Sequence, residues 1–198
     1  MTILRLIVGS VVSAAVLMAW GMLFWMVLPF GELAIHPLPD GDRLGALLHE
    51  TIPETGSYVW PMPEGGQQQP AGEGDENGAE PAAMSGRPFI HVFYSQEGSD
   101  PNGPTMYGLG FAHFAGTSLL VGCLLWFANL KWYISRVGLT VLSGVMAIWW
   151  QNFGDVIWWH HSCLYHVVLG GFELVGAVLM GLVMAAFVGP LPKKRRKD

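Results

Sequence analysis

Residues 107–130 read YGLGFAHFAGTSLLVGCLLWFANL, residues 137–158 read VGLTVLSGVMAIWWQNFGDVIW, and residues 164–188 read LYHVVLGGFELVGAVLMGLVMAAFV. Each stretch is long enough to cross a bilayer, which takes about 20 predominantly apolar residues. A fourth stretch, residues 6–28, contains no charged residue. Short links make the last three stretches an antiparallel hairpin series. The sequence therefore predicts an all-α integral membrane protein with four transmembrane helices.

The composition argues against most water-soluble classes of protein. Of the 198 residues, 52% are hydrophobic and only 13% are charged, where a soluble domain has about 25% charged residues. The net charge of −5 argues against a nucleic-acid-binding protein, and two cysteines are too few for a disulfide scaffold. We therefore expect membrane lipid around the chain and no nucleic-acid partner.

The N-terminal stretch has two interpretations, a cleaved signal or a retained anchor. Arg5 precedes an apolar run, as in a secretory signal. The run is longer than the ~7 to 15 residues of a signal core. Large residues between Trp20 and Trp25 also occupy the region where a small-residue cleavage site would lie. We therefore expect residues 6–28 to form a retained membrane anchor.

Charge predicts the orientation of the spans through the positive-inside rule. With four spans, eight basic residues fall on the same side as both termini. The loop at 31–106 carries 12 acidic residues and two arginines, a local net charge of −10, and falls on the other side. We expect both termini and the basic tail 189–198 to be cytoplasmic, with the tail near anionic lipid. The eight residues are Arg5, Lys131, Arg136, Lys193, Lys194, Arg195, Arg196 and Lys197.

The loop at 31–106 predicts a small α+β cap on the periplasmic side. A helix at 42–51, capped by Asp40 or Asp42, is followed by extended runs at 57–60 and 89–94 that favour a two-stranded sheet. Residues 62–86 are rich in Gly, Pro, Gln and Glu and contain no aromatic residue, which predicts a flexible insertion. Two strands alone are marginally stable. The sheet is therefore expected to rest on another surface. Four of its apolar side chains are candidates either for packing within the chain or for contact with a partner protein: Trp60, Phe89, Ile90 and Phe93.

Several ionisable side chains are predicted at one depth near the periplasmic face. Such groups are costly inside a bilayer and are functional candidates. At about 1.5 Å per residue, His113, Asp155 and His166 share this layer, and His160 and His161 lie in the adjoining link. Imidazole and carboxylate ligands suit zinc, copper or iron, and two histidines from different helices can also ligate haem. These five residues form the candidate site for a transition metal or haem.

The spacing of these residues keeps a simpler interpretation open. Asp155-x4-His160 and His161-x4-His166 do not share one helical face as a His-x3-His pair does. In this alternative Asp155 pairs with one histidine, and the other histidines lie in the wet interface. The sequence has no Gly-x-Ser-x-Gly or His-Glu-x-x-His motif, so no catalytic residues are assigned and no enzymatic activity is expected.

Glu173 is the deepest charged residue, about ten residues into the last stretch. Its ordinary interpretation is a carboxylic acid that desolvation keeps neutral. Its expected hydrogen-bond partner is Trp149, Trp150 or Gln151 of the neighbouring span. A proton- or ion-coupled transporter would need a chain of such groups.

Small residues recur every four positions in two of the predicted spans. Such stripes let another helix approach closely. The two stripes can pack against each other within the chain, against other integral membrane subunits, or against a second copy. The stripes are Gly108, Ala112 and Gly116 in one span, and Ala177, Gly181 and Ala185 in the other.

Short motifs in the first 60 residues carry a resemblance to other proteins. They are Trp20-Gly21, Trp25-Met26-Val27-Leu28-Pro29, Leu38-Pro39-Asp40, Ile52-Pro53-Glu54 and Gly56-x-Tyr58. With the segment 94–110, they resemble a set of small bacterial inner-membrane proteins that have one span, an extracytoplasmic loop and a further hydrophobic bundle. The set has no assigned activity. The resemblance therefore implies only a location in the bacterial inner membrane.

Three functions are compatible with these patterns. The first is a non-catalytic accessory, stabilising or assembly subunit of a larger inner-membrane complex, which the small-residue stripes and the marginal cap favour. The alternative is a membrane protein that binds copper, zinc, iron or haem at the periplasmic face. The third is a small proton- or ion-coupled transporter that depends on Glu173. We expect the first of these.

Overall fold

The computed structural model describes residues 3–61, 88–98, 100 and 103–190. The chain forms two compact units, Met1–His36 with Asp100–Asp198, and Pro37–Ser99. The predicted insertion at 62–86 and residues 191–198 of the predicted tail lie outside the described residues. The two units are described separately below.

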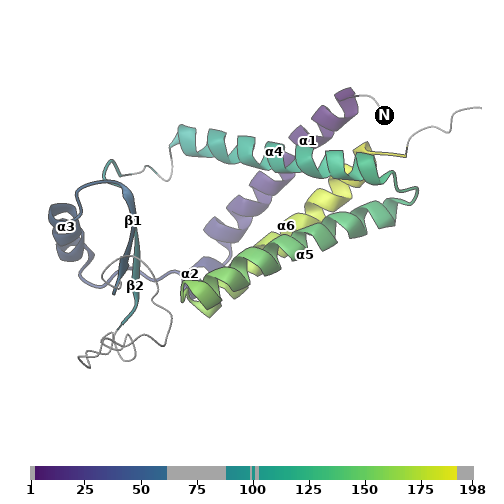
Figure 1. Cartoon of the computed structure of the whole chain (residues 1–198). Coiled ribbons are helices and arrows are strands. Elements are labelled where there is room, and N and C mark those ends of the chain that lie inside the picture. The colour runs from purple at the N-terminus through teal and green to yellow at the C-terminus, as the bar shows by residue number, and fades with distance from the viewer. Residues whose placement is uncertain (1–2, 62–87, 99, 101–102, 191–198) are drawn as a thin grey trace, which may run out of the picture. The chain divides into compact units, whose positions relative to one another are not determined.

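The larger unit is helical throughout. It contains α1 (Ile3–Met22), the π-helix η1 (Leu23–Val27), α2 (Phe30–Ala34), α4 (Pro104–Ala128), α5 (Tyr133–Trp158) and α6 (Cys163–Phe187) (Figure 1). Four segments are long and apolar enough to cross a membrane: Ile3–Val27, Pro104–Ala128, Tyr133–Trp158 and Cys163–Phe187. The lengths and composition of these helices indicate a multi-pass membrane protein.

The first span differs from the predicted uniform helix at 6–28. It begins at Ile3, and its last turn is a π-helix in which the Leu28 N–H donates to the Leu23 carbonyl at 3.0 Å. Pro29 has no N–H with which to continue the helix, and the short helix α2 follows it. Aromatic rings pack together around this turn, with centroid separations of 5.1–6.1 Å. The rings are those of Trp20, Phe24, Trp25, Phe30 and Phe172.

Helices α1, α4 and α6 share a buried core. Leu6, Leu125, Met184 and Val188 form its apolar cluster. Deeper in the same unit, the buried Ser118 hydroxyl of α4 donates to the Ser13 hydroxyl of α1 at 2.8 Å. Because neither hydroxyl is exposed, this hydrogen bond satisfies two polar groups that would otherwise be costly between apolar helices.

Helices α5 and α6 lie side by side (Figure 1) and approach closely through small residues. A methyl group added at Gly144 would lie 2.5 Å from the Ala177 Cβ, and one added at Gly181 would lie 3.3 Å from the Thr140 Cβ. Arg136 joins the same pair of helices. Its Nε donates to the Ala185 carbonyl at 3.2 Å. The predicted juxtamembrane cation is therefore buried, with its donors used at a helix end.

The two small-residue stripes have different surroundings. Ala177, Gly181 and Ala185 of α6 are buried, and the first two of them face α5. Gly108, Ala112 and Gly116 of α4 are exposed, and a methyl group added at either glycine would meet no described atom within 4 Å. The stripes thus do not pack against each other among the described residues.

The smaller unit contains α3 (Gly41–Thr51), β1 (Gly56–Trp60) and β2 (Ile90–Tyr94) (Figure 1). The strands pair antiparallel from Gly56 opposite Tyr94 to Trp60 opposite Ile90, which confirms the predicted two-stranded sheet. His49 of α3 hydrogen-bonds the Tyr94 hydroxyl at 2.7 Å and so ties the helix to β2.

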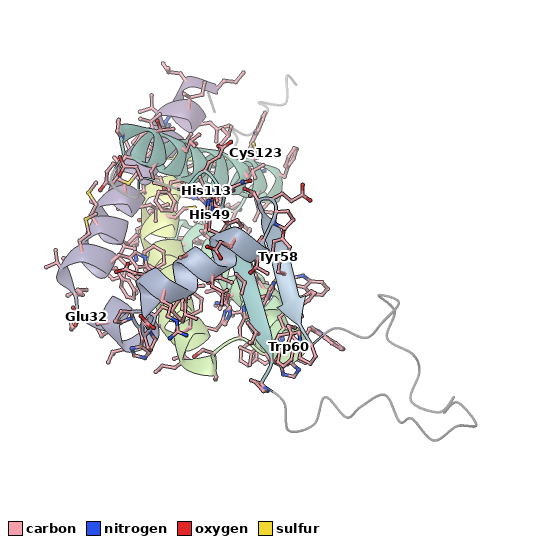
Figure 2. All side chains as sticks on the ribbon, turned by 90° about the vertical axis from the view of Figure 1, so that its left-hand side faces the viewer. Glu32, His49, Tyr58, Trp60, His113 and Cys123 are labelled. Carbon is pink, nitrogen blue, oxygen red and sulfur yellow. The ribbon has the colours of Figure 1, made fainter. Side chains whose placement is uncertain are left out.

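One detail of this unit differs from prediction, and a second bears on the two alternatives left open for its apolar side chains. Asp40 occupies the N-cap position of α3, but its side chain makes no capping hydrogen bond and lies 3.7 Å from Arg43 instead. The sheet also does not bury its apolar side chains, since Trp60 is 50% and Phe93 70% exposed, while Phe89 is half-buried. Figure 2 shows Trp60 at the end of its strand. Partner contact by these residues stays a prediction.

Candidate functional site

Asp155 organises the turn between α5 and α6 through its backbone. Its carbonyl accepts from the Trp159 N–H at 3.1 Å and from the His161 N–H at 3.3 Å. Between these two donors, His160 has a φ of 53°, in the left-handed region that reverses the chain direction. The turn therefore brings the His161 side chain back beside the last turns of α5.

Ser162 fixes the start of α6. Its side chain accepts from the Tyr165 N–H at 3.4 Å, the usual N-cap interaction, and its carbonyl accepts from the His166 N–H at 3.2 Å. His166 is therefore in the first turn of α6, and 93% of its surface is covered, since it is only 7% exposed.

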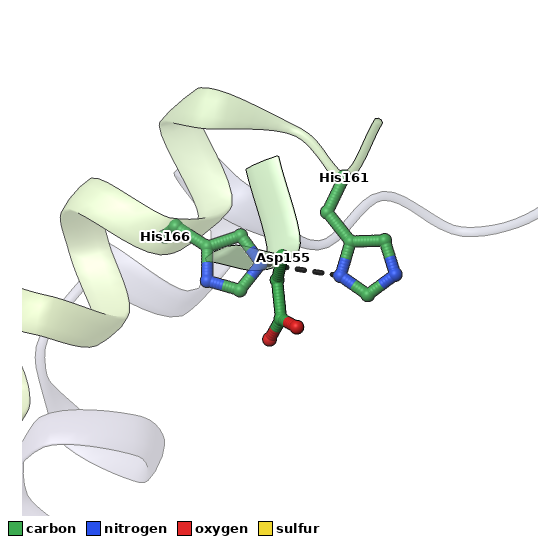
Figure 3. Close-up of side chains that lie close together, drawn as sticks. All are labelled: Asp155, His161 and His166. Carbon is green, nitrogen blue, oxygen red and sulfur yellow. Dashed lines mark hydrogen bonds between the residues drawn. The ribbon is translucent and has the colours of Figure 1, made fainter. Parts of the chain in front are cut away.

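Asp155, His161 and His166 form one cluster (Figure 3). Each residue offers one ligand atom, and these atoms lie within 4.8 Å of one another. His161 Nδ1 and His166 Nε2 are 3.2 Å apart, and the two rings stack with an interplanar angle of 15°. His161 and Asp155 are half-buried, so the cluster is partly accessible. The three ligand atoms thus lie close enough together to hold one metal ion.

His161 Nδ1 and His166 Nε2 form a hydrogen bond in this structure (Figure 3), and the distance between them is also close to that between two ligands of one metal ion. Zinc–nitrogen bonds of about 2.0–2.1 Å at a tetrahedral angle separate two ligand nitrogens by about 3.3 Å. The observed 3.2 Å is close to this value. The carboxylate oxygen of Asp155 lies within 4.8 Å of both nitrogens. Two histidines and one carboxylate with an open position also suit iron.

The other two predicted ligands lie elsewhere. His160 is exposed in the turn and does not belong to the cluster. His113, on α4 (Figure 2), lines a separate cavity of about 330 Å³ together with Thr117, Gln151 and Glu173. The structure therefore brings together three of the five residues that the sequence indicates.

Glu173 pairs with Asn152, not with the partners predicted from sequence. The Asn152 Nδ2 donates to Glu173 Oε2 at 3.0 Å. Trp149 and Trp150 face away from α6 and are 66% and 86% exposed, because the helical turn directs residue 152 toward that helix. The signal that could have identified Asn152 was its chemistry: an amide within an apolar span needs a hydrogen-bond partner there.

Comparisons with known proteins do not identify a relative of this chain. The sequence matches no protein-family model, and searches of curated proteins and of solved structures found no match. The resemblance to small bacterial inner-membrane proteins therefore stays a prediction, and any function must be inferred from the site itself.

Proposed function

We propose that this chain is a membrane protein that binds one transition-metal ion through Asp155, His161 and His166. The observation that carries the proposal is the convergence of the three ligand atoms within 4.8 Å, with the two imidazole nitrogens 3.2 Å apart. These ligands come from the end of α5, the turn and the start of α6. Three protein ligands leave one position of a tetrahedral ion open for water or another ligand.

The ligand set favours zinc, copper or iron as an ion over a haem held by both histidines. A haem iron held by two histidines carries them on opposite faces of the macrocycle. The 3.2 Å between the two facing nitrogens leaves no room for a ring system. His161 and His166 therefore fit two ligands of one bare ion on the same side.

Cobalt(II) binding to the purified chain tests the proposal. The chain carries an affinity tag without histidines and is dialysed against Co²⁺, whose visible absorption reports tetrahedral nitrogen and oxygen ligation. We expect one ion per chain in the wild type. His161→Ala and His166→Ala should each weaken binding at least about tenfold, since even loss of a residue that only supports a metal ligand costs 10- to 100-fold.

Two other histidines provide matched controls. His160→Asn removes the imidazole next to His161 but keeps a residue type that tolerates the left-handed φ of 53°. His113→Ala removes a histidine of another cavity. Both variants should bind cobalt as the wild type does. The proposal is wrong if the wild type binds no more cobalt than His161→Ala does, or if His160→Asn loses the ion to the same extent.

A second role, as a subunit of a larger membrane complex, is supported by the exposed face of α4. Gly108, Ala112 and Gly116 lie on this face with open space around the two glycines among the described residues. Such a face lets a partner helix approach closely. Extraction in mild detergent should then yield a partner at constant stoichiometry that Gly116→Leu removes without unfolding the chain. An isolated wild-type chain, or a partner unaffected by Gly116→Leu, would refute this role.

A further inference from the structure

The described lysine and arginine side chains of the larger unit gather at one end of its helices. Leu6 packs with Leu125 and Val188, so α1 begins where α4 and α6 end (Figure 1). The acidic side chains described in this unit lie in the middle of α6 or toward the other end: Glu32, Asp100, Asp155 and Glu173. Among the described residues, this end therefore carries cations without an acidic counterpart: Arg5, Lys131 and Arg136.

The two arginines at this end have different surroundings. Arg136 is buried, and its guanidinium group donates to the carbonyls of Leu130, Lys131 and Ala185. Arg5 is exposed, and within the described part of the chain no hydrogen bond or ion pair engages its guanidinium group. A guanidinium group in this position can pair with an external phosphate or carboxylate through two parallel hydrogen bonds.

Arg5 lines a groove between the start of α1 and the end of α6. The groove has a volume of about 340 Å³, and its other walls are apolar: Leu4, Val8, Ala186 and Phe187. The two helices pack tightly beside it, since a methyl group added at Gly9 would lie 2.7 Å from the Phe187 Cβ. Leu4 and Val8 are 68% and 41% exposed. The groove therefore opens to the surroundings of the span and combines one cation with an apolar surface.

The position and charge of the groove select its occupant. Leu4, Arg5 and Val8 lie in the first two turns of the span Ile3–Val27, where lipid headgroups meet acyl chains. A free phosphate would leave the apolar walls uncovered, and the cation of a zwitterionic headgroup would be repelled by Arg5 and Lys131. We propose that this groove binds one phospholipid with an anionic headgroup, with an acyl chain along the apolar walls and the phosphate at Arg5.

Native mass spectrometry of the full chain measures the binding of single lipid molecules. The chain is released from detergent micelles that contain increasing amounts of palmitoyl-oleoyl phosphatidylglycerol or of the matching phosphatidylcholine. We expect the first phosphatidylglycerol to bind at least about fivefold more tightly than the first phosphatidylcholine. Arg5→Gln should weaken phosphatidylglycerol binding about fivefold and leave phosphatidylcholine binding unchanged, because one basic residue near a membrane surface contributes about this factor toward an anionic lipid.

Matched variants separate the groove from the general charge of this end. Lys131→Gln removes an exposed positive charge at the same end but outside the groove, and should leave phosphatidylglycerol binding unchanged. Val8→Trp fills the groove without changing the charge, whereas Ile7→Trp places the same side chain at an exposed position outside it. Phosphatidylglycerol binding should be lost in Val8→Trp and retained in Ile7→Trp, with circular dichroism confirming both folds. Glycerol 3-phosphate, which has no acyl chain, should not compete.

Four results would overturn the proposal. Equal affinity of the wild type for the two lipids would show that the groove does not select an anionic headgroup. Equal losses in Arg5→Gln and Lys131→Gln would show that the lipid responds only to total charge. Equal binding to both tryptophan variants would show that the groove is not used. Competition by glycerol 3-phosphate would assign Arg5 to a free phosphate instead of a lipid.

Discussion

Gly144 of α5 offers a sharp test of the helix packing. An added methyl group would lie 2.5 Å from the Ala177 Cβ of α6. Ordinary carbon contacts are about 3.5–4.0 Å, so Gly144→Ala must separate the two groups by about 1.0–1.5 Å. The group that has to move is a Cβ fixed to its own backbone. The helices themselves must therefore shift.

The size of the effect follows from two opposing contributions. Overpacking of this kind costs about 1–3 kcal/mol, while replacing a helical glycine with alanine gains up to about 1 kcal/mol. Gly138→Ala, on the same helix, is the matched control because a methyl group there meets no described atom within 4 Å. The difference between the two variants in free energy of unfolding should therefore be about 1–3 kcal/mol, with Gly144→Ala the less stable.

A second variant relieves the clash between the added methyl group and the Ala177 Cβ. In Gly144→Ala/Ala177→Gly the new methyl group lies 3.9 Å from the Cα of residue 177, an ordinary contact. The double variant keeps one alanine and one glycine at the interface, so its stability should return to within about 1 kcal/mol of the wild type.

Titration with SDS from dodecylmaltoside micelles, followed by far-UV circular dichroism, measures the four proteins. Equal stability of Gly144→Ala and Gly138→Ala would refute the close approach of α5 and α6 at these residues. Failure of Ala177→Gly to rescue Gly144→Ala would show that the two residues do not face each other.

The same titration tests three polar contacts. Ser13→Ala and Ser118→Ala, alone and together, should give a coupling energy of about 0.5–1.5 kcal/mol for the buried hydroxyl pair, and strictly additive losses would contradict the contact. Arg136→Met leaves three carbonyls without their donor and should lose about 1.5–3 kcal/mol; an unchanged midpoint would contradict this. Glu173→Gln keeps an acceptor for Asn152 and should stay within about 0.5 kcal/mol of the wild type. Glu173→Leu should lose about 1–3 kcal/mol, and equal losses in the two variants would count against the pair.

The spans could be predicted because a bilayer imposes a minimum length on an apolar helix. The four apolar stretches indicate the four helices, and two runs of β-favouring residues indicate the strand pair of the smaller unit. The π-turn at Leu23–Val27 could not be predicted, since it depends on ring packing against Phe172, which is far away in sequence. Which helices pack against each other also could not be predicted from the sequence. Gly108 and Gly181 have the same kind of spacing, but only the second lies against another helix.

The candidate site could be predicted only as a set of residues at one depth. Depth follows from position along a helix, but convergence depends on the direction each side chain takes. The left-handed φ of His160 turns His161 toward His166. The three ligands come from two helices and the turn between them. The spacing of Asp155, His161 and His166 therefore resembles no metal-binding motif of a single helix. His113 has the right depth on α4, where it lines the cavity of Glu173 and not the metal cluster.

The polar contact between α5 and α6 depends on the small residues that let the two helices pack closely. The 3.0 Å hydrogen bond from Asn152 to Glu173 requires the two helices to lie close together. Gly170 provides part of that room, because a methyl group there would lie 3.4 Å from the Asn152 Nδ2 and 3.3 Å from Ile148. An apolar environment offers no other partner for an amide or a carboxyl group. The close approach that the glycines of this helix pair allow therefore also holds the Asn152–Glu173 hydrogen bond in place.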